Sequence, residues 1–70
     1  MVPLCFEYRS EEYPGQVIFV TILGQFKHHF TGETIYRVRE EFERGPAYEA
    51  YYTEARMQIA LANRIQEEVW

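Results

Sequence analysis

The side chains that could do catalytic or metal chemistry are few, and their spacing does not suit it. His28 and His29 are adjacent, so on a strand they point to opposite faces and cannot hold one metal ion together. The single cysteine, Cys5, has no further His or Cys at ligand spacing, and neither Cys5 nor Ser10 lies in a nucleophile motif. The sequence therefore predicts no metal site and no covalent catalysis.

Carboxylates are plentiful, but none of them lies in a recognisable catalytic sequence motif. The eleven acidic residues are all Glu, and sequential pairs such as Glu11-Glu12 and Glu40-Glu41 face apart on a strand. The four glycines stand singly, so no glycine-rich loop can cradle a phosphate. We expect no enzyme, no catalytic residue and no cofactor.

The elements that must position these residues begin with two strands. Residues 2–9 alternate apolar and polar side chains, which predicts a strand with one buried face, and Pro3 near its start favours an edge position. A Pro14-Gly15 turn follows. Residues 16–23 are apolar on both sides, which is typical of a central strand covered on both faces.

The next segments fix the register of the sheet. Gly24 interrupts the pattern before residues 25–30 resume it, either as a bulge or as a hairpin turn, and we favour the bulge. A three-residue loop over 31–33 would place Phe26 beside Val38, so that the apolar faces agree. Residues 34–43 alternate as a strand does, although their composition also permits a helix.

The C-terminal third predicts a long helix. Gly45-Pro46 is followed by residues 47–70 without Gly or Pro, and Pro46 suits a first helical position. A helix over 46–68 would be about 35 Å long. The expected fold is therefore α+β and a single domain over 1–70: a three-stranded antiparallel meander followed by one long C-terminal helix packed on the sheet (βββα).

That helix would carry two apolar stripes. One stripe includes Tyr51, Ala55 and Ile59 and would pack on the sheet, while Ala50, Met57 and Leu61 fall on a second stripe. The second stripe needs a partner of its own, a second copy or a different protein, unless the sheet curls far enough to cover both. A homodimer through this stripe is thus one expectation.

A nucleic-acid interface is an alternative use of the sheet. In the expected register Lys27, Arg37 and Arg39 share the face opposite Phe26, and Arg9 can join them. The arrangement resembles the strand-strand-strand-helix DNA-binding domains of some integrases and plant transcription factors. Against it, the net charge is −4, which disfavours the counterion release that drives such binding.

Composition favours a packed domain that works in a reducing cytoplasm. The aromatic share of 17% argues against disorder, and one cysteine excludes an internal disulfide. No stretch approaches the roughly 20 apolar residues of a membrane span, and no basic segment leads into an apolar one at the N-terminus. We expect no membrane partner.

The most favoured function is a non-enzymatic protein-binding module. Tyr, Trp, Met and Arg are enriched at protein interfaces, and an acidic surface suits a basic target. In general style the chain resembles small inhibitors from phages and mobile elements, including anti-CRISPR proteins, which implies a host-cell cytoplasm and a nucleic-acid-processing target. The residues expected to bind the partner are Glu11, Glu12, Tyr13, Glu40, Glu41, Glu43, Ala50, Met57, Leu61 and Trp70.

Overall fold

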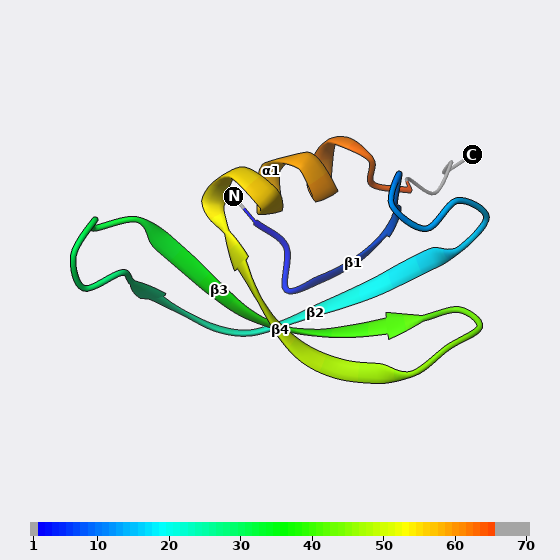
Figure 1. Cartoon of the computed structure of the whole chain (residues 1–70), viewed down its shortest axis with the longest axis horizontal. Helices are drawn as coiled ribbons and strands as arrows, with labels where there is room; N and C mark the ends of the chain where they lie inside the picture. Colours follow the sequence, from blue (N-terminus) through cyan, green and yellow to red (C-terminus); the bar gives the residue numbers. More distant parts are fainter. Residues whose placement is uncertain (1, 66–70) are drawn as a thin grey trace.

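The computed structural model describes residues 2–65 and shows a four-stranded antiparallel sheet followed by one short helix. The strands are β1 (Cys5–Arg9), β2 (Val17–Lys27), β3 (Thr34–Phe42) and β4 (Ala47–Thr53), and the helix is α1 (Glu54–Ala62). The strands lie in chain order, each paired with its neighbour (Figure 1). α1 crosses one side of the curved sheet, here called the inner face, and the opposite side is the outer face.

The predicted fold is wrong in its C-terminal third. The expected helix over 46–68 is a strand, β4, followed by a helix of nine residues, and the sheet has four strands instead of three. The strand forms because Tyr48, Ala50 and Tyr52 alternate with residues that face outward, and aromatic side chains favour a pleated, half-buried surface. Tertiary pairing with β3 overrides the helix-friendly composition.

Local signals mark both ends of β4. Gly45-Pro46 lies in a hairpin turn, where the Phe42 N–H donates to the Pro46 carbonyl at 3.3 Å and the Gly45 N–H to the Phe42 carbonyl at 3.3 Å. Thr53 is the N-cap of α1, and its hydroxyl accepts from the Arg56 N–H at 3.1 Å. The helix therefore begins at a capping threonine and not at the proline.

The first three strands and the bulge were predicted correctly. The register shifts between Ile22 and Gly24, which confirms the bulge, and β3 is a strand and not a helix. The predicted loop is wrong: residues 28–33 connect the strands, the His28 N–H donates to the Glu33 carbonyl at 2.6 Å, and Phe26 pairs with Ile35. The bulge and the longer loop together move Phe26 to the outer face.

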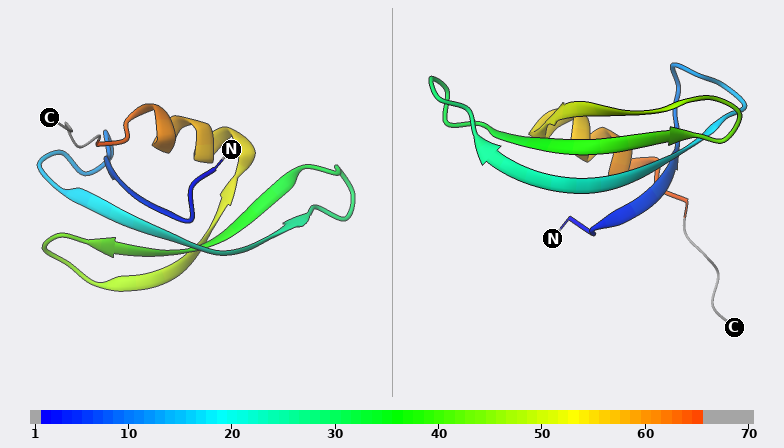
Figure 2. Two further views of the ribbon diagram at one scale, coloured as in Figure 1. Left: turned by 180° about the vertical axis from the view of Figure 1, so that it is seen from behind. Right: turned by 90° about the horizontal axis from the view of Figure 1, so that it is seen from below.

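The core lies between α1 and the inner face. Met57 is fully buried and Ala60 is 2% exposed, and both pack on side chains that the strands direct inward. β2 is central, as predicted, but α1 covers only one of its two faces (Figure 2). The buried apolar side chains are Phe6, Tyr8, Ile18, Val20, Tyr36, Val38, Tyr52, Met57 and Ala60.

The helix stripe that was expected to bind a partner lies in this core. Met57 has 0% exposure, and Ala50 and Leu61 are partly buried against the core. Ile59, which was expected to pack on the sheet, is 63% exposed. The start of α1 at Glu54 determines which side of the helix faces the sheet, and Met57 is on that side. The reason to expect a second copy on that stripe is therefore removed. Within residues 2–65, no helix is long and apolar enough to cross a membrane.

Candidate protein-binding surface

The outer face presents side chains in rows that run across the strands. Directly paired residues of an antiparallel sheet point to the same side. One row places Phe19 of β2 between Glu7 of β1 and Glu41 of β3. In the next row, Val17 is paired with Arg9. The sheet topology thus gathers carboxylates around an apolar centre from segments more than thirty residues apart.

These rows form a hollow, here called the acidic hollow. Its volume is about 400 Å³, and its lining comes from the first three strands and the residue after β3. Phe19 and Val17 are half-buried, while Glu7, Glu41 and Glu43 are exposed. The residues that line the acidic hollow are Glu7, Val17, Phe19, Glu41, Phe42 and Glu43.

Two of its carboxylates are already held by neighbouring groups. Glu43 Oε2 accepts from the Val17 N–H at 3.3 Å, and Glu41 Oε1 lies 3.1 Å from Arg39 Nε. The Arg39 and Glu41 side chains are 53% and 49% exposed, and an ion pair so exposed contributes little to stability. Glu41 can therefore exchange this cation for one from a partner at small cost.

The other end of the outer face carries an aromatic pair. Phe26 and Tyr51 contact each other edge to face, with ring centroids 6.1 Å apart, and are 50% and 63% exposed. Tyr51 pairs with Arg37 in the ladder and Phe26 with Ile35. Exposed aromatic residues next to arginine are typical of interface anchors.

The residues expected to bind nucleic acid do not form one cluster. Arg37 and Arg39 lie on the outer face of β3, and Arg9 is on the same face of β1. Lys27 pairs with Thr34 and donates to its hydroxyl at 2.9 Å, on the opposite side of the ladder from Arg37. Glu7, Glu41 and Glu49 lie on the same face as these arginines, so the outer face has mixed charge.

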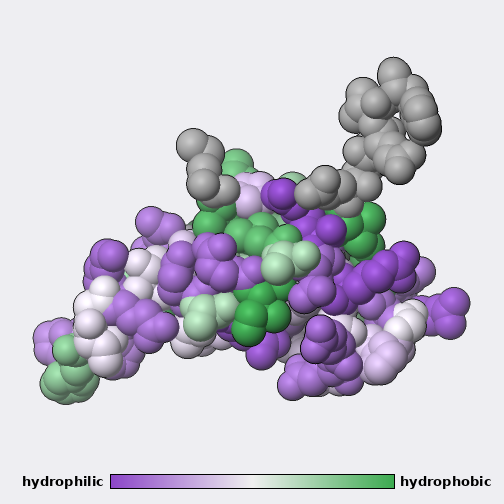
Figure 3. Space-filling model, turned by 90° about the horizontal axis from the view of Figure 1, so that it is seen from above, coloured by the Kyte–Doolittle hydropathy of each residue, from purple (hydrophilic) through white to green (hydrophobic). Residues whose placement is uncertain are grey.

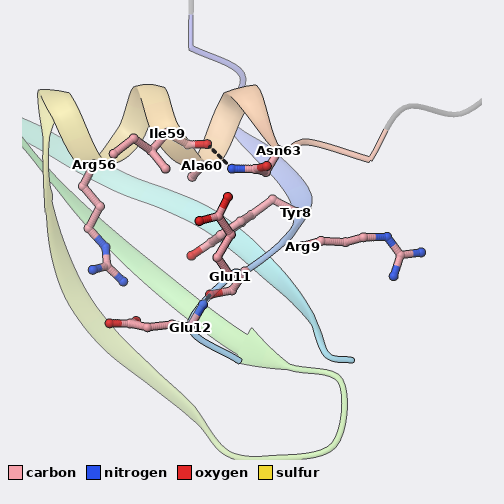
Figure 4. Close-up of a pocket in the computed structure, with 9 residues that line it drawn as sticks. Tyr8, Arg9, Glu11, Glu12, Arg56, Ile59, Ala60 and Asn63 are labelled. Carbon is pink, nitrogen blue, oxygen red and sulfur yellow. Dashed lines mark hydrogen bonds between the residues drawn. The ribbon is translucent and has the colours of Figure 1, made fainter. Parts of the chain in front are cut away.

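A second, smaller hollow lies between α1, the end of β1 and residues 10–12 (Figure 4). Its volume is about 200 Å³, with Tyr8 and Arg56 among the lining residues. The Glu11 side chain is directed toward α1, Glu12 extends below Arg56, and Arg9 points away. Glu11 and Glu12, predicted to bind a partner, thus lie outside the acidic hollow.

Glu40, also predicted to bind a partner, lies inside the fold. It is 3% exposed, and its Oε2 accepts from the Tyr52 hydroxyl at 2.6 Å. The Tyr8 hydroxyl lies 2.8 Å from that of Tyr52, and since Tyr52 donates its one proton to Glu40, Tyr8 donates to Tyr52. Glu40 is therefore part of a buried hydrogen-bond chain that links β1, β3 and β4.

The same chain changes the titration of Tyr52. Burial first, and then the hydrogen bonds with Glu40 and Tyr8, raise the pKa of the Tyr52 hydroxyl above its usual value. The Arg56 guanidinium covers the ring, 4.6 Å from its centroid. A second buried tyrosine behaves alike, since the hydrogen bond to Glu54 raises the pKa of Tyr36.

Tyr13, another predicted anchor, does not line the acidic hollow but contacts one of its lining residues, Phe42. Tyr13 is 44% exposed and contacts Phe42 edge to face at 5.1 Å, and Phe42 stacks on Tyr48 at 5.9 Å. Trp70 lies outside the described residues. The side that carries α1, seen in Figure 3, mixes hydrophobic and hydrophilic residues over short distances.

Sequence reasoning found part of the outer surface. Glu41 and Glu43 were predicted to bind a partner and both line the acidic hollow, but Glu7 and Val17 were missed. The alternation of side chains along β1 and β2 places Glu7 and Val17 on one face, but it shows which residues lie beside them only when the pairing register of the strands is known. Tyr51 was missed as part of this face because its segment was assigned to a helix.

Among residues 2–65, no three His, Cys, Asp or Glu side chains lie close enough together to share a metal ion. Comparisons with protein-family models, with curated proteins and with solved structures give no match.

Proposed function

We propose that this chain is a non-catalytic protein-binding module that docks its outer sheet face on a basic surface of a protein partner. The observation that carries the proposal is the acidic hollow, in which Phe19 lies between Glu7 and Glu41. Lysine and arginine have long apolar stems and charged ends. Such a side chain can pack its stem on Phe19 and Val17 and bring its charge to the carboxylates.

The aromatic pair at the other end of the face supports the same function. Phe26 and Tyr51 offer apolar area that the chain itself leaves exposed. Buried aromatic anchors supply most of the affinity of protein interfaces, while surrounding charges mainly set specificity and association rate. The partner class that fits is a protein with clustered Lys and Arg, as nucleic-acid-processing proteins have. Inhibition of such a protein, as anti-CRISPR proteins achieve, is the corresponding biological role.

The test compares two pairs of charge-neutralising substitutions. Glu7→Gln with Glu41→Gln changes the acidic hollow, and Glu11→Gln with Glu12→Gln removes the same charge from the loop beside α1. Each form is immobilised, proteins retained from a lysate of the source cells are quantified, and the affinity of each retained protein is measured. We expect one basic partner whose affinity falls about 100-fold with the first pair and little with the second.

A partner that binds equally to both double variants would contradict the proposal. The DNA-binding alternative has a separate readout, the binding of duplex DNA at physiological salt. If the duplex binds the parent chain and Arg37→Ala with Arg39→Ala abolishes it, the nucleic-acid function replaces the one proposed.

A further inference from the structure

The backbone of β4 offers hydrogen-bonding groups along its free edge. In an antiparallel pair, residues that exchange backbone hydrogen bonds with the neighbouring strand alternate with residues whose groups point away. The Phe42 N–H donates to the Pro46 carbonyl, so Tyr48, Ala50 and Tyr52 continue the bonded series toward β3. The N–H and carbonyl groups of Ala47, Glu49 and Tyr51 therefore face outward.

Nothing in the described part of the chain covers that edge. Within residues 2–65, no backbone hydrogen bond outside the regular elements involves Ala47, Glu49 or Tyr51. Viewed from below, β4 forms one margin of the sheet and β1 the other (Figure 2, right). Free edges are usually protected by charged side chains, above all Lys, by Pro or by a bulge. Between Ala47 and Thr53, β4 contains no Lys, Pro or bulge, and its one charged residue is Glu49.

We propose that a second copy of this chain pairs with this edge, β4 against β4, in an antiparallel arrangement centred on Ala50. In that register the whole of β4 is paired, with Ala50 opposite Ala50 and Tyr48 opposite Tyr52 of the second copy. Glu49, the only charged residue of the strand, then lies opposite Tyr51, whose hydroxyl can donate to a carboxylate. The outward backbone groups of the two copies face each other and can bond.

Neighbouring registers of the two β4 strands are less favourable. In every possible register the outward backbone groups of one copy must face those of the other, so one strand can shift along the other only in steps of two residues. A shift in one direction places Glu49 opposite Glu49 of the second copy, and directly opposed like charges are destabilising. A shift in the other direction centres the pairing on Tyr51 and leaves Ala47 and Tyr48 unpaired. The sequence of β4 is thus most complementary to itself in the register proposed.

The pairing would join two sheets into one of double width. The two-fold axis of an antiparallel edge pair is perpendicular to the sheet, so both outer faces, and both acidic hollows, lie on the same side. The paired edge is small compared with a standard interface, so we expect association that depends on concentration. The inference does not rest on the proposed function, and the two can be told apart because substitutions in the acidic hollow leave the edge of β4 unchanged. Tyr51 belongs both to the aromatic pair and to this edge, so its variants are compared only by their association.

The first experiment measures molar mass against concentration by sedimentation. We expect the parent chain to approach twice its monomer mass as concentration rises. Tyr51→Pro removes an outward N–H while sparing the bonds to β3, and should weaken association at least about 10-fold. Tyr51→Thr, the control, keeps the N–H and a strand-forming side chain, and should still dimerise.

Circular dichroism of both variants checks that the sheet is intact. A parent chain that stays monomeric at every soluble concentration would overturn the proposal. So would a Tyr51→Pro variant that is folded and associates as the parent does.

The second experiment tests the register. With Cys5→Ser removing the free thiol, Ala50→Cys places two thiols opposite each other across the axis, where the Cα separation of about 4.5 Å permits a disulfide. Tyr48→Cys in the same background places them about 13 Å apart along the strands. We expect rapid oxidative crosslinking only for Ala50→Cys, and equal crosslinking of the two variants would exclude the register.

Discussion

The two edges of the sheet differ in what their outward backbone groups bind. At β1, the residues after α1 act as a short additional strand: the Ile65 N–H donates to the Glu7 carbonyl at 2.9 Å and the Arg9 N–H to the Asn63 carbonyl at 3.2 Å. At β4, the corresponding groups of Glu49 and Tyr51 have no such partner within residues 2–65. Within residues 2–65, the chain pairs outward groups of β1 by itself and leaves those of Glu49 and Tyr51 without a backbone partner.

The difference follows from the path of α1. The helix leaves β4, crosses the inner face and ends beside β1 (Figure 1). The residues that follow it, Asn63 and Ile65, bond to the outward groups of β1. A helix that starts at one edge and ends at the other can cover only the edge at which it ends. The coverage of β1 therefore depends on how firmly α1 is packed.

The largest predicted effect is that of a substitution at the buried centre of α1, which tests whether the coverage of β1 depends on the packing of the helix. Met57→Ala should lower the free energy of unfolding by about 3 kcal/mol, because it leaves a cavity beneath the helix. Urea denaturation followed by circular dichroism measures it. Hydrogen exchange should show that β1 loses its protection together with α1.

The matched control lies on the opposite side of the same helix. Ile59 is 63% exposed, so Ile59→Ala should change the free energy by about 0.5 kcal/mol or less. Equal decreases in the free energy of unfolding for the two substitutions would mean that Met57 does not hold α1 on the sheet.

This pair of residues also shows where prediction from the sequence succeeded and failed. The existence of β1, β2 and β3 could be predicted because period-2 alternation is a local property, and Gly24 marked the bulge. The predicted bounds were too long, since β1 starts at Cys5 and β2 ends at Lys27. The assignment of Met57 to an exposed stripe and Ile59 to the sheet depended on the rotation of a helix with the wrong first residue. Thr53, a good N-cap, was the available signal.

The site was harder to predict than the strands. The acidic hollow brings together Glu7, Phe19 and Glu41 only through a register that the bulge shifts and the loop over 28–33 sets. Glu40 and Glu41 look alike in the sequence, yet one is buried against Tyr52 and the other lines the hollow. Neighbours on a strand have opposite environments, so an error in register or face reverses the role of each residue.

The second prediction concerns the buried chain that connects the two edge strands. Tyr52→Phe removes the donor to Glu40 and should cost about 2 kcal/mol at neutral pH, since a buried carboxylate loses its hydrogen bond. Tyr8→Phe removes only the bond between the tyrosines and should cost about 1 kcal/mol. Urea titrations at neutral pH give both values.

The dependence of the free energy of unfolding on pH above 10.0 distinguishes these substitutions further. The raised pKa of Tyr52 keeps its hydroxyl protonated in the folded chain after unfolded tyrosine ionises at its usual pKa of 10.0. Folding then binds a proton, so its contribution to stability is complete below pH 10.0 and decreases as pH rises above that value. We expect Tyr52→Phe to flatten this decrease. An unchanged slope would indicate that Tyr52 ionises as freely in the folded chain as in the unfolded one.

A further prediction is a difference in amide exchange between the two edges. In dilute samples the Arg9 amide, bonded to Asn63, should exchange at least about 10-fold more slowly than the amides of Glu49 and Tyr51. At high concentration the two β4 amides should slow as the second copy pairs with them, while Arg9 should not change. Equal exchange rates at both edges in dilute samples would show that the backbone groups of β1 are no better protected than those of β4.

A single substitution can make the two edges alike. Ile65→Pro removes the N–H that donates to Glu7 and should cost about 1 kcal/mol, the usual contribution of one hydrogen bond. The Arg9 amide should then exchange nearly as fast as that of Tyr51, because the segment that covers β1 loses one of its two backbone bonds. If Arg9 keeps its protection in this variant, its bond to Asn63 forms without the bond between Ile65 and Glu7, and the two backbone bonds of this edge are independent of each other.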